Sequence, residues 1–339
     1  MIAITETIYQ NAEHCAAKFH IPHCTVNAQE IFESPNVDVV FILTSDEYHE
    51  PYTIAALQAG KHVMLEKPIS LSIPSAQRII DAEAKARGPR VFVGYMRRYA
   101  LSFTQIFKRE IADIPRILYA RARDFPGPNA KFENESGTFQ VRNTDFPPEA
   151  GEQRDKLLKN LYAEAFPESK EITPQHISLC RFLGSLGSHD ISLLREVFGM
   201  PESIAGVTIN EPFHSALFNY RNKGGNKEPF SLTYESGIDA VPEFDAHLAV
   251  YGEKKRVAIY YDSPFVKGLP IKVKVQEVND AGEMSTREIL GSYEDAYTAE
   301  LKELWACIVE RKDIKTSAED AMQELKIFDM IYRKWENRS

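Results

Sequence analysis

The run KHVMLEKP at residues 61–68 constrains the fold more than any other stretch of the sequence. It follows Gly60, its centre is apolar, and it ends in Glu66, Lys67 and Pro68. A short apolar run that follows a turn residue is typical of a buried strand in a parallel sheet. Because proline has no backbone N–H to donate, we expect the strand to end before Pro68. Lys67 would then lie at the carboxyl end of a strand, where open α/β sheets bind ligands, although Glu66 and Lys67 can also be ordinary surface charges there.

The segments on both sides of this run predict a β–α–β–α–β unit. Apolar strands are predicted at 36–44 and 90–95, and helices at 51–59, which ends at Gly60, and at 74–87, which is capped by Ser72 and closed by Gly88. Strands that alternate with helices in this way favour a right-handed, doubly wound parallel sheet of the Rossmann type. The predicted fold class is therefore α/β.

Three motifs of this unit resemble a known family. VDVVFILTSDEYH (37–49), AALQAGKHVMLEKP (55–68) and VGYMRRY (93–99) resemble, in order and spacing, the glucose–fructose oxidoreductase/inositol dehydrogenase (Gfo/Idh/MocA-type) family of NAD(P)-dependent sugar and polyol dehydrogenases. The resemblance returns at the end of the chain and so covers most of the 339 residues. It implies a Rossmann-type domain, a second α+β domain with a mainly antiparallel sheet, and NAD or NADP as the cofactor.

The composition is that of an ordinary globular protein, and it argues against several function classes. Hydrophobic residues make up 43% and charged residues 26% of a chain that is long enough for two domains. The net charge of −9 argues against a nucleic-acid or anionic-membrane surface, and no apolar run approaches the ~20 residues of a membrane helix. The first ten residues lack the pattern of a signal peptide, and the four scattered cysteines fit neither a disulfide framework nor a zinc site. We therefore expect a cytoplasmic protein with reduced thiols and no metal.

The start of the chain departs from the family pattern. The resemblance implies a first strand, a GxGxxG-type phosphate loop and a first helix, but the chain opens on a predicted strand at 2–6 and a helix at 10–19, which normally follow those elements. Loss of the first strand would split the sheet, because that strand is central in the order 3-2-1-4-5-6. Two explanations stay open: a start codon placed too late, or a chain that has lost part of its cofactor site. Glu6 either contacts the cofactor ribose or is a solvated turn carboxylate.

The pattern predicts three regions. A dinucleotide-binding domain at 1–98, without its phosphate-loop unit, is followed by an α+β substrate and oligomerisation domain at 99–295 and by C-terminal helices at 296–339 that pack back near the first domain. The resemblance places Arg97 or Arg98 at the cofactor or substrate edge, and a helix-start or interdomain ion pair is the alternative.

The second domain is predicted to begin with a helix at 102–111 and a strand at 116–124. The segment 125–173, which contains a helix at 151–166, reads as an insertion that acts either as a lid or contact surface or as surface decoration.

The second set of candidate residues lies in GSLGSHD at 184–190, which continues into an amphipathic helix that ends near Gly199. The family pattern here resembles Asp-x-x-x-His, and His189 matches its histidine. The position four residues earlier is Ser185, whose hydroxyl brings no charge to stabilise an imidazolium. Asp190 does not replace the missing carboxylate, because adjacent helix residues point about 100° apart.

Alternating segments predict a mainly antiparallel sheet in the second domain, followed by two terminal helices. The strands are expected at 203–209, 215–220, 230–235, 246–251, 256–261 and 271–277, and the helices at 297–310 and 316–333. The resemblance implies that the protein forms a homo-oligomer through this sheet.

The resemblance implies hydride transfer between a nicotinamide cofactor and a secondary alcohol of a sugar, inositol or related polyol. Lys67 and His189 are the catalytic candidates, and Lys67, Ser185 and His189 are the substrate candidates. The cofactor candidates are Glu6, Thr44, Ser45, His49, Glu66, Lys67 and Arg97. The alternative is a catalytically impaired member that acts as a regulatory or binding protein.

Overall fold

The computed structural model describes residues 3–5, 7–136, 146–223 and 227–336. Its internal contacts divide the chain into two compact units. Unit 1 is formed by Met1–Gly94, Phe139–Gly184 and Leu304–Leu325, and unit 2 by Tyr95–Thr138, Ser185–Glu303 and Lys326–Ser339. Residues 139–184, which sequence analysis assigned to the second domain, therefore group with unit 1.

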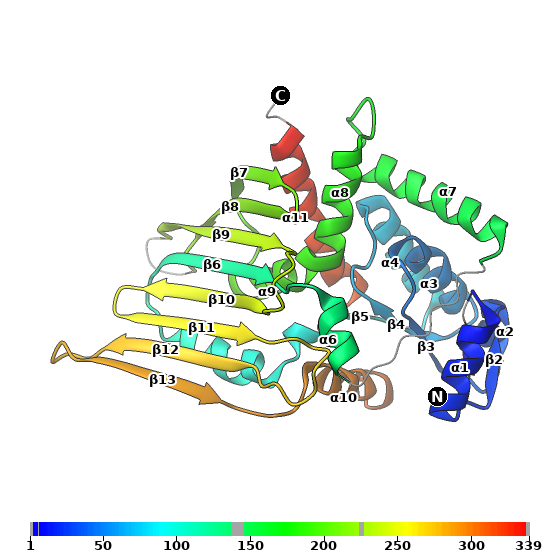
Figure 1. Ribbon diagram of the computed structural model, residues 1–339, viewed down its shortest axis with the longest axis horizontal. Coiled ribbons are helices and arrows are strands. Elements are labelled where there is room, and N and C mark those ends of the chain that lie inside the picture. The colour runs from blue at the N-terminus through cyan, green and yellow to red at the C-terminus, as the bar shows by residue number, and fades with distance from the viewer. Residues whose placement is uncertain (1–2, 6, 137–145, 224–226, 337–339) are drawn as a thin grey trace. The chain divides into compact units, whose positions relative to one another are not determined.

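Unit 1 contains two separate parallel sheets (Figure 1). Strand β1 (Ala3–Thr5) pairs with β2 (His23–Thr25), and β3 (Val39–Ile42), β4 (His62–Glu66) and β5 (Val91–Gly94) form the second sheet. A strand is confirmed within each of the predicted ranges 2–6, 36–44, 61–68 and 90–95, although residues 2 and 6 lie outside the described residues. Strand β2 was not predicted. In the described part of unit 1, no strand pairing joins the two sheets.

Helices connect the parallel strands of unit 1, as the alternating pattern predicted. They are α1 (Tyr9–Phe19), α2 (Ala28–Glu33), the short η1 (Asp46–Tyr48), α3 (His49–Gln58) and α4 (Ile73–Ala86). Ser72 caps α4 by accepting a hydrogen bond from the backbone N–H of Ser75, as predicted. The predicted closure at Gly88 is wrong by one residue, because Arg87 takes the left-handed backbone conformation, with φ 55°, that ends the helix.

The insertion packs on unit 1 through α7 (Pro148–Ala165). Glu164 of α7 accepts hydrogen bonds from Ser72 at 2.5 Å and from Arg78 of α4 at 3.1 Å. Arg78 also donates to Glu50 on α3, at 2.6 Å from its Nε. The inserted helix is thus tied to the two helices that flank β4, and α8 (Pro174–Phe182), which was not predicted, follows it.

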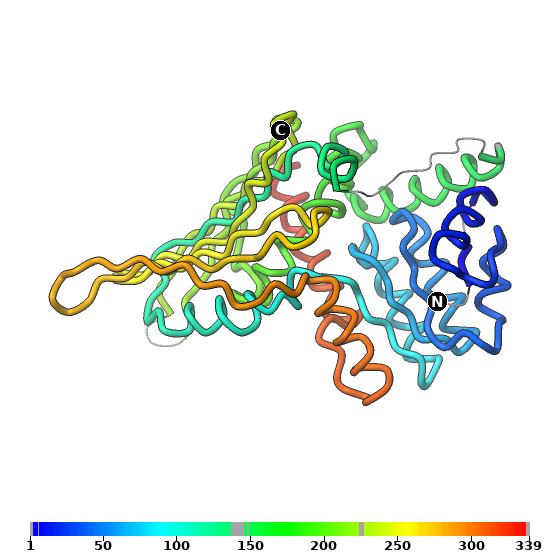
Figure 2. Tube along the Cα trace, turned by 60° about the horizontal axis from the view of Figure 1, so that its bottom comes forward, coloured from blue at the N-terminus to red at the C-terminus, as the bar shows by residue number. Residues whose placement is uncertain are grey.

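Unit 2 is built on one eight-stranded sheet in the order β13-β12-β11-β10-β6-β9-β8-β7. All its pairings are antiparallel except that of β6 with β9. The strands are β6 (Ile117–Phe125), β7 (Ser203–Asn210), β8 (Phe213–Arg221), β9 (Pro229–Gly237), β10 (Asp245–Gly252), β11 (Lys255–Tyr261), β12 (Lys272–Val278) and β13 (Met284–Leu290). The predicted mainly antiparallel sheet is confirmed; β13, which was not predicted, forms an extended hairpin with β12 (Figure 2).

Helices cover one face of this sheet, since η3 contacts β11 and β12 and α9 (Ser188–Phe198) contacts β6. The helix predicted at 102–111 consists of a π-helical segment, η3 (Ser102–Phe107), and α5 (Lys108–Ala112). The helix predicted after residue 184 likewise starts with a π-helical segment, η4 (Leu183–Gly187), before α9. Unit 2 also contains η2 (Met96–Arg98) and α6 (Asn129–Glu135).

The terminal helices are α10 (Ala296–Val309) and α11 (Ala318–Glu336). A boundary between the two units falls within each of these helices. Ser317 accepts a hydrogen bond from the backbone N–H of Asp320, which confirms the predicted cap of α11. None of the helices in the described part of the chain is long and apolar enough to cross a membrane.

Candidate active site

The candidate residues of unit 1 gather where two neighbouring strands end. Strands β3 and β4 run parallel with Ile42 opposite Leu65, so the segments after Ile42 and after Glu66 leave the sheet at the same edge. Thr44, which is exposed, and Lys67, which is half-buried, lie on these segments two residues beyond that pair. The carboxyl end of a parallel sheet is where α/β folds bind their ligands.

His49 ties the two strand-end segments together. Its side chain is fully buried, with Nδ1 2.7 Å from the carbonyl oxygen of Pro68 and Nε2 3.2 Å from that of Thr44. Both ring nitrogens therefore face the backbone of the segments that carry Lys67 and Thr44. The structure places His49 as a clamp that fixes these segments, and direct contact with a cofactor stays a prediction.

Glu66 shapes the same edge from the end of β4. Its carboxylate accepts a hydrogen bond from the backbone N–H of Lys67 at 3.1 Å. A side chain in place of Gly94, opposite Glu66 in the sheet, would come within 2.9 Å of Met64 and 3.4 Å of the Glu66 carboxylate. Burial raises the pKa of Glu66, while the charge of Lys67 and the hydrogen bond from its N–H lower it.

Asp46 is a third charged group at this edge, and sequence reasoning did not single it out. It is the first residue of η1, just after Thr44 and Ser45, so its place after a predicted strand was the available signal. Burial raises the pKa of Asp46, whereas the charges of His49, Lys67 and Arg181 lower it. Arg181 belongs to α8, so the helix that follows the insertion brings a cation to the strand ends.

The insertion also holds η1 in place. Arg154 of α7 lies 3.1 Å from the carboxylate of Glu47, which is buried, and Ser45 donates to the same carboxylate oxygen at 2.8 Å. Because ion pairs fix geometry when one partner is buried, α7 supports the segment that follows β3.

No glycine lies among residues 3–5 and 7–19, the described part of the first strand and the first helix. Glu6 lies outside the described residues, so its predicted ribose contact has no structural counterpart. Gly60 is the first glycine in the sequence. The first turn of α1 contains no acidic side chain, and the side chain of its N-cap residue, Ile8, makes no hydrogen bond to the helix. Residues for the cofactor's phosphates, which favour close-approaching backbone amides, are thus not among the candidates in the described part of unit 1.

In unit 2, Arg97 lies in a buried ion cluster. One of its guanidinium nitrogens, Nη1, is 2.8 Å from the carboxylates of both Asp124 and Asp190, and the group lies 4.9 Å from the ring centre of Tyr261. Arg97 and Asp190 are 4% exposed and Asp124 is fully buried. This arrangement agrees with the ion-pair alternative, except that both partners of Arg97 lie in unit 2 and the ion pair is therefore not interdomain. A cofactor role for Arg97 stays a prediction.

The cluster contains more acid than base. Burial and the neighbouring Asp124 carboxylate raise the pKa of Asp190 well above its usual range, although Arg97 lowers it. Burial opposes the charge of Arg97, but the two carboxylates outweigh it and raise the pKa of the guanidinium. One guanidinium balances one carboxylate, so burial and the neighbouring Asp124 carboxylate outweigh Arg97 in setting the direction of the Asp190 pKa.

Ser185 and His189 occupy different helical segments. Ser185 is exposed on the π-helical η4, and His189 is half-buried in the first turn of α9. Short π-helical segments inside helices occur often at functional sites. The substrate and proton-transfer roles of both residues stay predictions, as do the cofactor roles of Thr44, Ser45 and Glu66.

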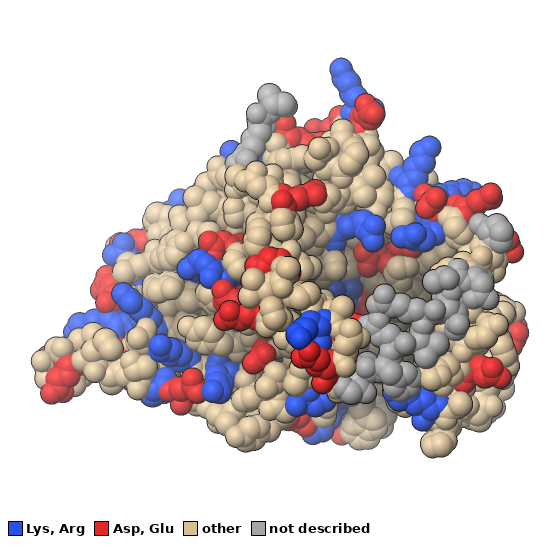
Figure 3. Space-filling model, viewed as in Figure 1, with Lys and Arg blue, Asp and Glu red and all other residues tan. Residues whose placement is uncertain are grey.

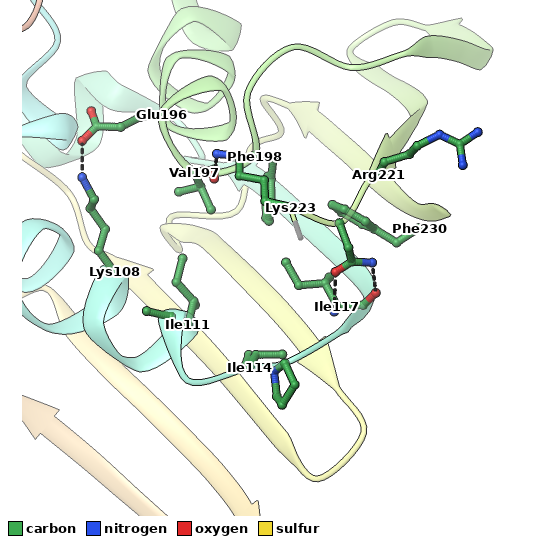
Figure 4. Close-up of a pocket in the computed structure, with 13 residues that line it drawn as sticks. Lys108, Ile111, Ile114, Ile117, Glu196, Val197, Phe198, Arg221, Lys223 and Phe230 are labelled. Atoms are coloured by element: carbon green, nitrogen blue, oxygen red, sulfur yellow. Dashed lines mark hydrogen bonds and ion pairs between the residues drawn. The ribbon is translucent and has the colours of Figure 1, made fainter. Parts of the chain in front are cut away.

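A cavity of about 360 Å³ also lies in unit 2 (Figure 4). Isoleucine and phenylalanine side chains form much of its wall, and none of the predicted site residues lines it. Its two lysines already donate to the protein, Lys108 to Glu196 at 3.0 Å and Lys223 to the carbonyl oxygen of Val197 at 3.1 Å. The guanidinium of Arg221 points away from it in Figure 4. In the described part of the chain, no cluster of three or more His, Cys, Asp or Glu residues could hold a metal ion.

A Rossmann-type unit with charged groups at its strand ends, followed along the chain by a unit built on a large mixed sheet, places the protein in the class of two-unit α/β proteins with a dinucleotide-binding fold. Two family models match the chain: the NAD-binding Rossmann domain of the oxidoreductase family over residues 1–95, and the C-terminal alpha/beta domain of that family over residues 178–339. Together they cover more than half of the chain, which therefore belongs to the Gfo/Idh/MocA oxidoreductase family.

Known relatives agree with this assignment. An inositol 2-dehydrogenase of Klebsiella pneumoniae is 37% identical over 93 residues, a match that covers 26% of this chain and only 28% of that protein. A levoglucosan dehydrogenase bound to NADH and levoglucosan has the same fold, with a TM-score of 0.71 at 16% identity over 100% of this chain and 88% of that one. A 3-ketoreductase from Actinomadura kijaniata, bound to NADP, has a TM-score of 0.71 at 14% identity over 98% and 89% of the two chains.

Proposed function

We propose that this protein is an NAD(P)-dependent dehydrogenase that oxidises a secondary alcohol of a sugar, inositol or related polyol. The observation that carries the proposal is the position of Lys67, on the segment that leaves β4 beside the segment that leaves β3. A lysine at that edge suits the chemistry of a proton acceptor for a substrate hydroxyl. The names of the relatives, which act on inositol and on levoglucosan, support the class of substrate.

The residues of unit 1 suit the nicotinamide end of the cofactor. Thr44 and Ser45 offer hydroxyl groups, Glu66 offers a carboxylate for ribose hydroxyls, and His49 holds the segments that carry them. When bound, the nicotinamide supplies the hydride acceptor. Glu6 and Arg97 complete the proposed set of cofactor residues.

Proton transfer is the task of the protein in this reaction. Lys67 takes the proton of the substrate hydroxyl as the carbon–hydrogen bond breaks, and its charge stabilises the oxygen while negative charge develops there. His189 is the second proposed residue for proton transfer, and its imidazole can donate or accept a hydrogen bond. In this proposal Ser185 offers His189 a hydrogen bond but no charge, so it stabilises a protonated imidazole less than a carboxylate at this position would.

The test is a spectrophotometric assay of NAD or NADP reduction with inositol and a panel of sugars, using the wild-type chain and Lys67→Met. We expect the substitution to lower kcat about a hundredfold or more and to leave cofactor binding intact. Lys61→Met is the matched control, since Lys61 precedes the other end of the same strand and donates to the backbone of Ser34. Equal turnover by both variants would remove Lys67 from the mechanism.

A regulatory or binding role is the second candidate function. Two observations favour it: Ser185 stands where the family pattern has a carboxylate, and the first glycine of the sequence is at position 60. A chain that binds a sugar in calorimetry but reduces neither NAD nor NADP would support this role.

We also propose that the protein forms a homo-oligomer through the open face of the unit 2 sheet. This face presents partly exposed tyrosines and a row of ion pairs, in which Arg121 and Arg123 contact Glu235 and Arg123 contacts Asp245. Basic and acidic side chains are interspersed over the face of the molecule shown in Figure 3, a pattern that allows self-complementary pairing. Light scattering of the wild type and of Glu235→Lys tests this, with a smaller species expected for the variant.

A further inference from the structure

The strand ends of unit 1 carry a carboxylate, that of Asp46, to which the proposed function assigns no role. Asp46 begins η1 four residues after the end of β3, and Lys67 follows the last residue of β4, the neighbouring parallel strand. His49 spans the two segments, with contacts of 2.7 Å to Pro68 and 3.2 Å to Thr44. Asp46 and Lys67 thus lie on segments that the same buried imidazole holds together.

The chain around residue 184 approaches the same carboxylate. A Cβ on Gly184 would lie 3.8 Å from Oδ2 of Asp46, 3.3 Å from Pro68 and 2.7 Å from Leu71. Only a glycine allows the backbone to come this close without displacing Leu71. The backbone that leads directly into Ser185 therefore passes beside the Asp46 carboxylate.

From this placement, and on the basis of the proposed function, we propose that Asp46 is a positioning residue for Lys67 and the acceptor of its proton. The substrate hydroxyl gives its proton to the neutral amine of Lys67 while the hydride leaves for the oxidised nicotinamide. An N–H proton of the resulting ammonium then passes to the Asp46 carboxylate and on to solvent. The carbonyl product, the reduced cofactor and one released proton balance the reaction.

The charges around Asp46 fit this role. Lys67, His49 and Arg181 favour its ionised form, whereas Glu47 and burial oppose it. Tyr162 of α7 also faces this group, and burial raises the pKa of that phenol to about 12, so it stays protonated near neutrality. Burial is the largest effect and raises the pKa of this carboxyl, while the neighbouring charges limit the rise, so the group can both take a proton and release it.

The experiment compares the wild type with Asp46→Asn, using Asp38→Asn as the matched control. Asp38 is exposed and precedes the amino end of the same strand, β3. Two readouts are taken: the pH profile of kcat, and the pH dependence of Lys67 acetylation by acetic anhydride, followed by mass spectrometry without substrate or cofactor. Melting temperatures of the three proteins show whether each variant is folded.

In Asp46→Asn we expect kcat to fall about tenfold, and we expect both its decline on the acid side of the pH profile and the pH of half-maximal Lys67 acetylation to shift down by about one unit. Asp38→Asn should match the wild type in all three. Unchanged acetylation of Lys67, or unchanged kcat with an unchanged profile, overturns the proposal. If the folded wild type oxidises no alcohol, the proposed function and the proton relay fail together, and a shift in acetylation then supports only the positioning of Lys67.

Discussion

Replacing Arg97 with methionine tests whether this arginine stabilises unit 2 or binds the cofactor. In the structure its guanidinium is 4% exposed and lies 2.8 Å from two carboxylates, those of Asp124 and Asp190. Methionine fills a similar volume but leaves both carboxyl groups buried without a cation. Removing one partner of a buried ion pair costs about 3–5 kcal/mol, because the remaining charge is not compensated. We therefore expect Arg97→Met to lower the free energy of unfolding of unit 2 by this amount.

The loss should depend on pH in a definite direction. The pKa of Asp190 is raised in the folded protein, by burial first and by Asp124 second, while Arg97 lowers it. A carboxyl of this kind contributes its full stability below its ordinary pKa, near 3.8, and this contribution is lost as the pH rises toward the folded-state pKa. Because Arg97→Met raises that pKa further, the variant should lose more stability relative to the wild type at pH 8 than at pH 5.

Urea unfolding followed by tryptophan fluorescence measures this effect. The chain has two tryptophans, and Trp305→Phe leaves Trp335, which belongs to unit 2, as the reporter. Arg221→Met is the control, since Arg221 pairs with Glu202 at 2.7 Å while both side chains are about half exposed, and such a pair contributes at most about 1 kcal/mol. A loss below about 1 kcal/mol for Arg97→Met, together with lost NAD or NADP binding, would refute the structural role and assign Arg97 to the cofactor.

Three further predictions concern the buried carboxyl, the helix before His189 and the cofactor. Asp190→Asn should flatten the dependence of the unfolding free energy on pH between 5 and 8, because the amide still accepts a hydrogen bond from Arg97 but does not titrate. A steeper pH dependence, measured by urea unfolding, would contradict this. Ser185→Asp should raise kcat or shift its pH profile if the serine weakens His189, and no change in either would make the position incidental. The 339-residue chain has no glycine before residue 60, so we expect it to bind NAD or NADP weakly in calorimetry. Each charge-assisted hydrogen bond to the pyrophosphate contributes roughly 1.5–3 kcal/mol, so a binding site with two fewer of them has an affinity about a hundredfold lower or more. A micromolar dissociation constant would show that another segment holds the phosphates.

Local sequence patterns were sufficient for most of the secondary structure. The strand at 61–68 and the helix cap at Ser72 depend on neighbouring residues only, namely an apolar run stopped by proline and a side chain that bonds a backbone N–H three residues later. Short strands without a clear apolar period, such as β2 and the exposed β13, escaped prediction because little of their surface is buried.

The sequence alone therefore determined the class of fold, the order of its elements and the placement of Lys67 at a strand end, because these follow from periodicity and from residues close together in the chain. Only the tertiary structure decided which distant groups meet. It separated β1 and β2 from β3, β4 and β5, packed the insertion on unit 1, buried Arg97 between Asp124 and Asp190, and placed Asp46 on a segment that a buried histidine ties to that of Lys67. These contacts depend on how helices and strands that are far apart in the sequence bury their apolar surfaces and pair their charges, and local sequence patterns do not predict them.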